Sequence, residues 1–239
     1  DKDYLKEARF ICSLLKQLDF NTEELLEFGS GSSKLSIILA ETFSKITCID
    51  SNKSMLEYAH MNLSKVAKEL ASKIELVEEN LLDLSLGRRF DLIISIFHVI
   101  CYFNSNKDLN SFFKTSALHL KKNGLLIFDY WNGPAVIHQK PTNTIKNIDH
   151  ENFRITRNGI SKLDTFKSLV NVKYKIEYQQ ESKPIETYFE EHSMRYLFPN
   201  EIDFYAEING FEVLKHSTWL KDRIPTIEDW SAFSILRRK

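Results

Sequence analysis

The feature that most constrains this 239-residue chain is the alternation of short β-rich runs and helical segments over its first 130 residues. Apolar residues recur with a helical period in four stretches: 4–18, 35–43, 55–70 and 109–120. Between them lie five runs typical of strands: 25–28, 46–50, 74–77, 90–97 and, after an Asn123-Gly124 break, 125–130. Strands and helices in alternation predict a parallel sheet with helices on both faces.

The pattern changes in the second half of the chain. Residues 153–198 show no helical period, and the segment 170–178 alternates strictly between apolar and polar residues, as a half-exposed antiparallel strand does. Another strand is expected at 188–198. A helix is expected at 199–209, between Pro199 and Gly210, and two closing strands at 211–219 and 230–236.

We therefore expect an α/β fold with a Rossmann-like, seven-stranded, mostly parallel sheet and helices on both faces. Residues 1–133 and 199–239 would form this domain, and residues 134–198 an inserted antiparallel β subdomain. A compact insertion at this point of the chain would lie above the carboxyl ends of the strands. Open α/β sheets bind their ligands there.

A glycine turn follows the first expected strand, in the run Glu27-Phe28-Gly29-Ser30-Gly31. Glycines at such a strand-to-helix turn let the backbone approach a ligand closely, and the following helix favours an anionic group. Asp50 closes the second strand, where a carboxylate accepts hydrogen bonds from a ribose. A tight turn without a ligand is the plain alternative. A nicotinamide or flavin dinucleotide is another, but Lys34 stands where that fingerprint needs a third glycine.

These motifs resemble those of the class I S-adenosylmethionine (SAM)-dependent methyltransferases. The resemblance implies that Asp50 holds the SAM ribose, that Met55 packs on the adenine, and that Asn80 contacts the adenine amino group through its amide oxygen. Ser33 stands where many members carry a third glycine. In similar enzymes the N-terminal segment often closes over the methionine moiety as a lid. The expected cofactor residues are Tyr4, Arg9, Glu27, Phe28, Gly29, Ser30, Gly31, Asp50, Ser51, Met55, Asn80, Leu81, Ser95 and Phe97.

A narrower resemblance covers the second half, in the runs 128–136 and 194–198 and in Trp230. It is to a bacterial methyltransferase subgroup whose genes often lie among those for surface polysaccharides. The overall plan is also similar to the N,N-dimethyltransferases that act on amino sugars attached to a nucleoside diphosphate. The resemblance implies a small acceptor, such as a sugar or a nucleotide-linked sugar in surface glycan synthesis. Three alternatives stay open: a methyltransferase of another small metabolite (an amine or amino acid), a dinucleotide-dependent oxidoreductase, and a non-catalytic SAM-fold protein. Whether the methylated atom is nitrogen or oxygen also stays open.

Methyl transfer to an amine or a hydroxyl releases a proton, so a base near neutral pKa is useful. His98 directly follows the fourth strand and is the leading candidate, with Tyr102 beside it; local capping of the strand end is the alternative for His98. Tyr130 and Trp131 are expected to line the acceptor pocket, although core packing explains Tyr130 equally well. Arg154 and Arg195, in the insertion, are candidates to pair with a substrate phosphate.

Composition and missing motifs narrow the classes further. A net charge of −1 and the sequence Ser95-Ile96-Phe97-His98, in place of the tetrapeptide of DNA methyltransferases, disfavour a nucleic-acid substrate. The histidines show no metal-ligand spacing, so no metal is expected. Three cysteines without a CxxC pair, no membrane-length apolar run and no signal pattern favour a cytoplasmic protein. The sequence begins without Met, so we expect a few natural residues before it. The oligomeric state, monomer or homodimer, stays open.

Overall fold

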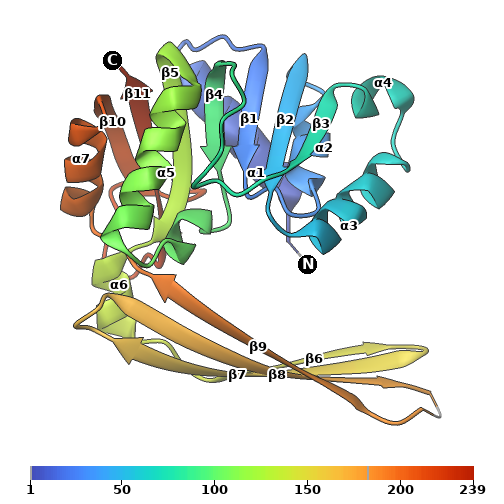
Figure 1. The fold of residues 1–239 in the computed structure, drawn as a ribbon. Helices are drawn as coiled ribbons and strands as arrows, with labels where there is room; N and C mark the ends of the chain where they lie inside the picture. The colour runs from blue at the N-terminus through green and yellow to red at the C-terminus, as the bar shows by residue number, and fades with distance from the viewer. Residues whose placement is uncertain (1, 182) are drawn as a thin grey trace.

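The computed structural model describes residues 2–181 and 183–239, and its main element is a seven-stranded sheet, called the main sheet below (Figure 1). The strand order is β10-β11-β5-β4-β1-β2-β3. The strands are β1 (Glu24–Phe28), β2 (Lys45–Asp50), β3 (Ile74–Glu78), β4 (Phe90–Ser95), β5 (Leu120–Trp131), β10 (Phe211–Thr218) and β11 (Ser231–Arg238). Only β11 runs against its neighbours, β5 and β10. The predicted seven-stranded, mostly parallel α/β fold is confirmed.

Helices cover both faces of the main sheet, and each face has its own apolar core. One core includes α1 and α2, and the other includes α5 and α7. The helices are α1 (Tyr4–Gln17), α2 (Lys34–Leu39), α3 (Lys53–Leu63), α4 (Lys68–Ala71), α5 (Asn106–His119), α6 (Gly133–Gln139) and α7 (Pro199–Ile208), with a 3-10 turn η1 (Val99–Tyr102). Because both faces of the central strands are covered, β1 and β4 are almost wholly buried, as their apolar runs predict.

Three boundaries differ from the sequence-based expectation. The helix expected at 35–43 ends at Leu39, and the one expected at 55–70 is divided into α3 and α4 because Ala67 is extended between them. The Asn123-Gly124 pair does not precede β5 but lies inside it. Asn123 takes a positive φ of 64°, and the pairing register with β4 shifts at this point, so the pair forms an irregularity within the strand.

The insertion differs from the expectation in two ways. It begins with a helix, α6, in which Pro134 occupies the first turn, where its missing N–H costs nothing. It then forms an extended rather than compact antiparallel sheet, called the arm below, with the strand order β6-β7-β8-β9 (Figure 1). Its strands are β6 (Thr144–His150), β7 (Phe153–Asp164), β8 (Leu169–Gln180) and β9 (Glu186–Arg195).

The arm is anchored at one end, beside the carboxyl ends of β4 and β5. Met194 of β9 joins the core on the α5 face of the main sheet. Val170 and Val172 of β8 pack with Val136 of α6 and with Tyr196. Beyond this anchor the strands extend away from the main sheet, and every residue of β6 is exposed. The arm is therefore held by its base, with its outer part in solvent.

Candidate active site

A cavity of about 470 Å³ lies at the carboxyl edge of the main sheet, where the strand order reverses about β1 and β4. It is lined by the turn after β1, the ends of β2 and β3, the segment after β4, and one residue of the arm. The lining residues are Gly29, Gly31, Asp50, Ser51, Asn52, Met55, Asn80, Leu81, Val99, Tyr102, Phe103 and His192. Eight of the residues predicted from the sequence thus meet at one cavity.

The glycine turn brings the backbone of β1 against the residues after β4. Gly29 has a φ of +67°, and a Cβ added there would lie 2.5 Å from the Val99 side chain. Gly31 has a φ of +53°, and its Cβ would lie 3.3 Å from Met55. Any larger residue at Gly29 would be strained and would displace Val99. Close packing against Val99 therefore requires the first glycine, in addition to any approach of a ligand.

Asp50 is fixed by two backbone groups at the end of β2. Its Oδ2 accepts a hydrogen bond from the Gly31 N–H at 2.7 Å, and its Oδ1 accepts one from the Asn52 N–H at 2.8 Å. Each carboxylate oxygen keeps a further acceptor position for a ligand hydroxyl. Asn80, on the next strand end, accepts from the Leu82 N–H at 3.0 Å, which orients its amide oxygen. Both side chains are thus held in place at the cavity by backbone donors.

Glu27 lies beneath the cavity rather than in its wall. It is 2% exposed, and its Oε2 accepts a hydrogen bond from the Ser36 hydroxyl of α2. Burial is the largest influence on it and raises the pKa of Glu27 to about 7, with the Asp50 charge acting in the same direction. Phe28, its neighbour, is fully buried in the core. These two predicted cofactor residues therefore support the glycine turn from below.

Several buried polar atoms near this turn have no hydrogen-bond partner among the described residues. They include Oγ of Ser30, Ser33 and Ser95 and Oε2 of Glu7. Glu7, on α1, was not predicted; its Oε1 contacts Lys2 and the indole N–H of Trp219, and burial raises its pKa. Buried polar groups normally have a partner. Unpaired hydroxyls and a carboxylate at this edge fit a ligand that carries both an ammonium and a carboxylate.

Of the two residues predicted to form a lid on α1, Tyr4 lies near the site and Arg9 does not. The Tyr4 ring meets the Phe97 ring edge-on at 5.6 Å, and the Lys34 ammonium lies 5.8 Å from the Tyr4 ring centre. Tyr4 thus covers the segment after β4. Arg9 lies on the exposed side of α1, away from the cavity lining, so the structure does not bring it to the site.

His98 is held by Asp129, a residue that the sequence analysis did not select. Oδ1 of Asp129 accepts a hydrogen bond from the His98 backbone N–H at 2.7 Å, and its Oδ2 lies 3.1 Å from the ring Nδ1, an ion-pair distance without hydrogen-bond alignment. The Asp129 side chain is 2% exposed and that of His98 26%. Phe97 and His98 both have positive φ, 75° and 62°, a conformation that costs energy and is common at functional sites. Asp129 could have been selected from the sequence, because it lies near the end of β5.

Tyr102 lies in the cavity wall and contacts the arm. Its hydroxyl lies 3.2 Å from Nδ1 of His192, and the two rings meet edge-on. Burial raises the pKa of Tyr102 above its ordinary value. His192 was not predicted as a site residue, because its contact with the cavity depends on how the arm returns to the main sheet. The alternation of β9 was the available signal, since it places His192 on the same face as buried Met194.

The residues predicted to contact the substrate lie in four different surroundings. Trp131 is half-buried beside the His98 ring, 6.1 Å away, and packs on Trp230. Tyr130 is fully buried in the core, so it is not exposed to an acceptor. The Arg195 guanidinium is occupied by Glu201 and Asn106, and Arg154 pairs with Asp149 on the outer part of the arm. Each of these arginines is already paired within the chain, and the phosphate role predicted for both stays a prediction.

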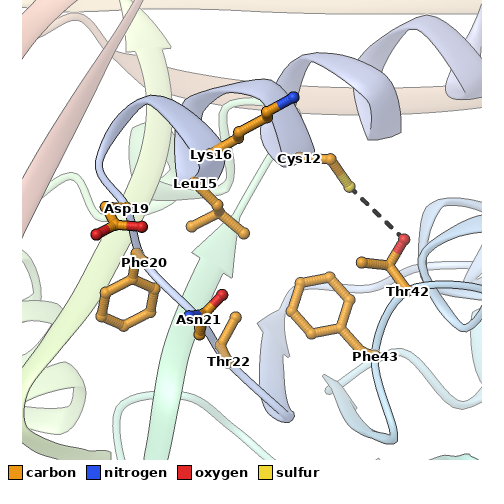
Figure 2. Close-up of a pocket in the computed structure, with 9 residues that line it drawn as sticks. All are labelled: Cys12, Leu15, Lys16, Asp19, Phe20, Asn21, Thr22, Thr42 and Phe43. Carbon is orange, nitrogen blue, oxygen red and sulfur yellow. Dashed lines mark hydrogen bonds between the residues drawn. The ribbon is translucent and has the colours of Figure 1, made fainter.

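A second hollow of about 350 Å³ lies at the opposite, amino-terminal edge of the main sheet (Figure 2). The end of α1 and the segments before β1 and β2 form it, and the Cys12 thiol points toward the Thr42 hydroxyl at 3.8 Å. None of the predicted site residues lines it. The candidate active site is therefore the cavity at the carboxyl edge.

Comparisons with known proteins agree with this placement. Residues 26–126, which include the glycine turn, Asp50 and His98, match the family model for a methyltransferase domain. This match covers less than half of the chain. The chain is 23% identical to the dTDP-3-amino-3,4,6-trideoxy-alpha-D-glucopyranose N,N-dimethyltransferase of Streptomyces venezuelae over 130 aligned residues. The alignment covers 54% of this chain and 52% of that relative. The chain thus spans about half the length of this curated relative in the match.

Solved structures share the fold of the whole chain, the arm included. An S-adenosylmethionine-dependent methyltransferase from Clostridium acetobutylicum is 20% identical, with a TM-score of 0.86, covering 100% of this chain and 93% of that one. SAM-bound CalS10, an amino pentose methyltransferase from Micromonospora echinaspora, is 15% identical, with a TM-score of 0.77 and coverage of 100% and 92%. At these identities the likeness establishes the fold.

Two further observations concern the part of the chain that the structure describes. Within residues 2–181 and 183–239, His, Cys, Asp and Glu side chains do not gather in groups of three or more that could hold a metal ion. In the same residues, no helix combines the length and the apolar character needed to cross a bilayer.

Proposed function

We propose that the protein transfers a methyl group from SAM to the amino nitrogen of a nucleotide-linked sugar, leaving S-adenosylhomocysteine (SAH). The observation that carries this proposal is the cavity, which is lined by Asp50, the glycine turn and Val99, the residue that follows His98 of the His98–Asp129 pair. The methyltransferase domain and the amino-sugar relatives support the reaction and the acceptor class.

The residues at the cavity fit SAM in three places. Asp50 offers acceptor positions to the ribose hydroxyls, and Met55 and Leu81 offer apolar surface to the adenine. The unpaired atoms of Ser30, Ser95 and Glu7, which are buried outside the lining of this cavity, would offer partners to the methionine carboxylate and ammonium. Lys34, at the position of the third dinucleotide glycine, continues to disfavour a nicotinamide cofactor.

SAM, when bound, supplies a methyl group on a positively charged sulfur. The chain must align the acceptor nitrogen with that methyl and exclude water. His98, half-buried after β4, receives the proton that the nitrogen loses. Asp129 stabilises the imidazolium that results, because its buried carboxylate lies at an ion-pair distance from Nδ1. Trp131 and Tyr102 flank this position and restrict the approach of the acceptor.

The test combines transfer and binding. The protein is incubated with labelled SAM and a panel of nucleotide-linked amino sugars, their hydroxyl analogues, small amines and amino acids, and products are detected by mass. SAH binding is measured by calorimetry. We expect label on the amino sugars and, in Asp50→Ala, SAH binding weaker by about 100-fold, because charge-assisted hydrogen bonds are lost. Glu78→Gln, at the paired position on β3, is the matched control and should bind SAH normally.

Each outcome has a distinct meaning. If only the hydroxyl analogues are labelled, the atom that accepts the methyl group is oxygen rather than nitrogen. Label on small amines or amino acids alone would contradict the nucleotide-linked acceptor. NAD binding in the absence of SAH binding would overturn the proposal in favour of an oxidoreductase. Saturable SAH binding without any transfer would favour a non-catalytic protein.

A further inference from the structure

The arm presents one face toward the methyltransferase domain, and strand alternation decides which residues lie on it. Met194 and Val172 are buried at the base of the arm and define this inward face. The pairing register places His192, Tyr174 and Arg157 on the same face, farther out. Glu190, opposite Tyr174, is on this face as well, and its carboxylate lies 3.5 Å from Nε2 of His192. Arg154, three positions before Arg157, lies on the outward face and pairs with Asp149.

The three residues form a continuous row that ends at the cofactor cavity. The Arg157 guanidinium lies 4.8 Å from the centre of the Tyr174 ring. The Tyr174 ring meets the His192 ring edge-on at 5.7 Å, and His192 contacts the Tyr102 hydroxyl at 3.2 Å. The row therefore leads from a cation on β7 to the wall of the candidate active site.

A second cation stands beside Arg157. Lys146 of β6 is directly opposite Arg157 in the strand pairing, so both side chains lie on the inward face. Like charges at directly opposite positions destabilise a sheet. Outward-facing Arg154 and Lys173 each have an acidic partner, but within the described residues no carboxylate pairs with Lys146 or Arg157. Two adjacent cations without an acid form a ready site for an anion with several oxygens.

We propose that Arg157 and Lys146 bind the diphosphate of a nucleoside diphosphate-linked acceptor, and that Tyr174 and His192 lie along its sugar. The inference rests on the proposed function, because the sugar end must reach Tyr102 and the cavity. The forked guanidinium suits phosphate oxygens, and its position over Tyr174 holds it in place. The aromatic row offers apolar faces to a sugar ring. The arm thus recognises the part of the acceptor that does not react.

The test measures binding of the free nucleoside diphosphates UDP and dTDP to SAH-saturated protein by calorimetry. We expect Arg157→Ala to weaken their binding by about 10-fold or more, because charge-assisted hydrogen bonds to phosphate are lost. Lys146→Ala should have a smaller effect, because Lys contributes a point charge rather than a fork. The matched control is Arg154→Ala, on the same strand and the opposite face, which should bind as the wild type does.

Unchanged affinity in Arg157→Ala, or an equal loss in Arg154→Ala, would overturn the inference. Arg157→Lys keeps the charge without the fork and should fall between wild type and alanine, which guards against a loss caused by misfolding. Inorganic pyrophosphate is the third probe. If pyrophosphate binds as tightly as the nucleoside diphosphates do, the site does not recognise the nucleoside-linked form, and that part of the inference is overturned.

SAH binding separates this inference from the proposed function. Arg157→Ala should keep the wild-type affinity for SAH, because Arg157 does not line the cavity that contains Asp50 and the glycine turn. If the wild type binds nucleoside diphosphates through Arg157 but does not bind SAH, the proposed function fails and the anion site stands. If SAH binds and nucleoside diphosphates do not, the anion site fails and methyl transfer to another small acceptor stands.

Discussion

The strands of the main sheet and those of the arm differ in how far they are buried. The central strands β1 and β4 are buried on both faces between two cores, so their side chains have little freedom to change without loss of stability. In the arm, β6 is wholly exposed and β9 is buried only at its base. One side of the cavity is therefore built on a rigid framework, and the other on a projecting sheet whose residues are freer to vary.

The two regions also treat charge differently. The main sheet encloses single carboxylates, Glu27 and Asp129, at about 2% exposure or less. The arm carries many charges in solvent, such as the ion pair between Lys173 and Glu191. Buried charge is costly unless it has a function or a partner, whereas exposed pairs contribute little. Substitutions in the framework should therefore have large effects on chemistry and stability, and those in the arm should mainly change acceptor recognition.

The largest expected effect is at the His98–Asp129 pair. His98→Ala and Asp129→Asn should each lower kcat by about 100-fold or more, because a positioned base contributes that much to proton transfer. SAH affinity should stay near the wild-type value in both, since neither residue lines the SAM cavity. Steady-state kinetics and calorimetry check the two quantities. Near-normal kcat across pH in His98→Ala would show that another group, or water, takes the proton.

The next effect concerns the buried acid of the framework. The pKa of Glu27 is raised from 4.5 to about 7, so the folded state holds a proton that the unfolded state releases. The stability contribution of this proton is complete below pH 4.5 and is lost as pH rises to about 7. Glu27→Gln should remove this decline, which amounts to about 3 kcal/mol. Chemical denaturation at pH 4.5 to 7.5 measures it.

Glu41→Gln, at an exposed position after α2, is the control for Glu27→Gln. It should leave the pH dependence of the unfolding free energy as in the wild type, because the Glu41 side chain is exposed rather than buried. If Glu27→Gln kept the wild-type decline, another buried acid, such as Glu7, would be its source.

The sequence predicted the framework better than the arm, and the reason is physical. Buried parallel strands need continuous apolar runs and their turns need glycines, so β1, β4 and Gly29 are visible in the sequence itself. Contacts between the arm and the cavity depend on register and on the path of the chain after α6. Arg154 pairs with Asp149 on the outer part of the arm, and no local pattern in the sequence signals that pairing.

The candidate site shows the same division. Asp50 and Met55 could be placed because a strand end and the helix after it fix them. Asp129 shared that signal, at the end of β5, and was missed because it is not exposed and lies among apolar residues in the sequence. His192 could be found only by combining strand alternation with the knowledge that Met194 packs against the main sheet.

A smaller effect is expected in the arm, at His192. His192→Ala removes one hydrogen bond to Tyr102 and an edge-on ring contact, both at the edge of the cavity. A net loss near 1 kcal/mol should raise the acceptor KM by about fivefold and leave kcat within about twofold. Phe189→Ala is the control, because Phe189 lies on the outward face of the same strand and is 75% exposed. A large fall in kcat in His192→Ala would give the arm a part in the chemistry, and the division between a reacting framework and a recognising arm would no longer hold.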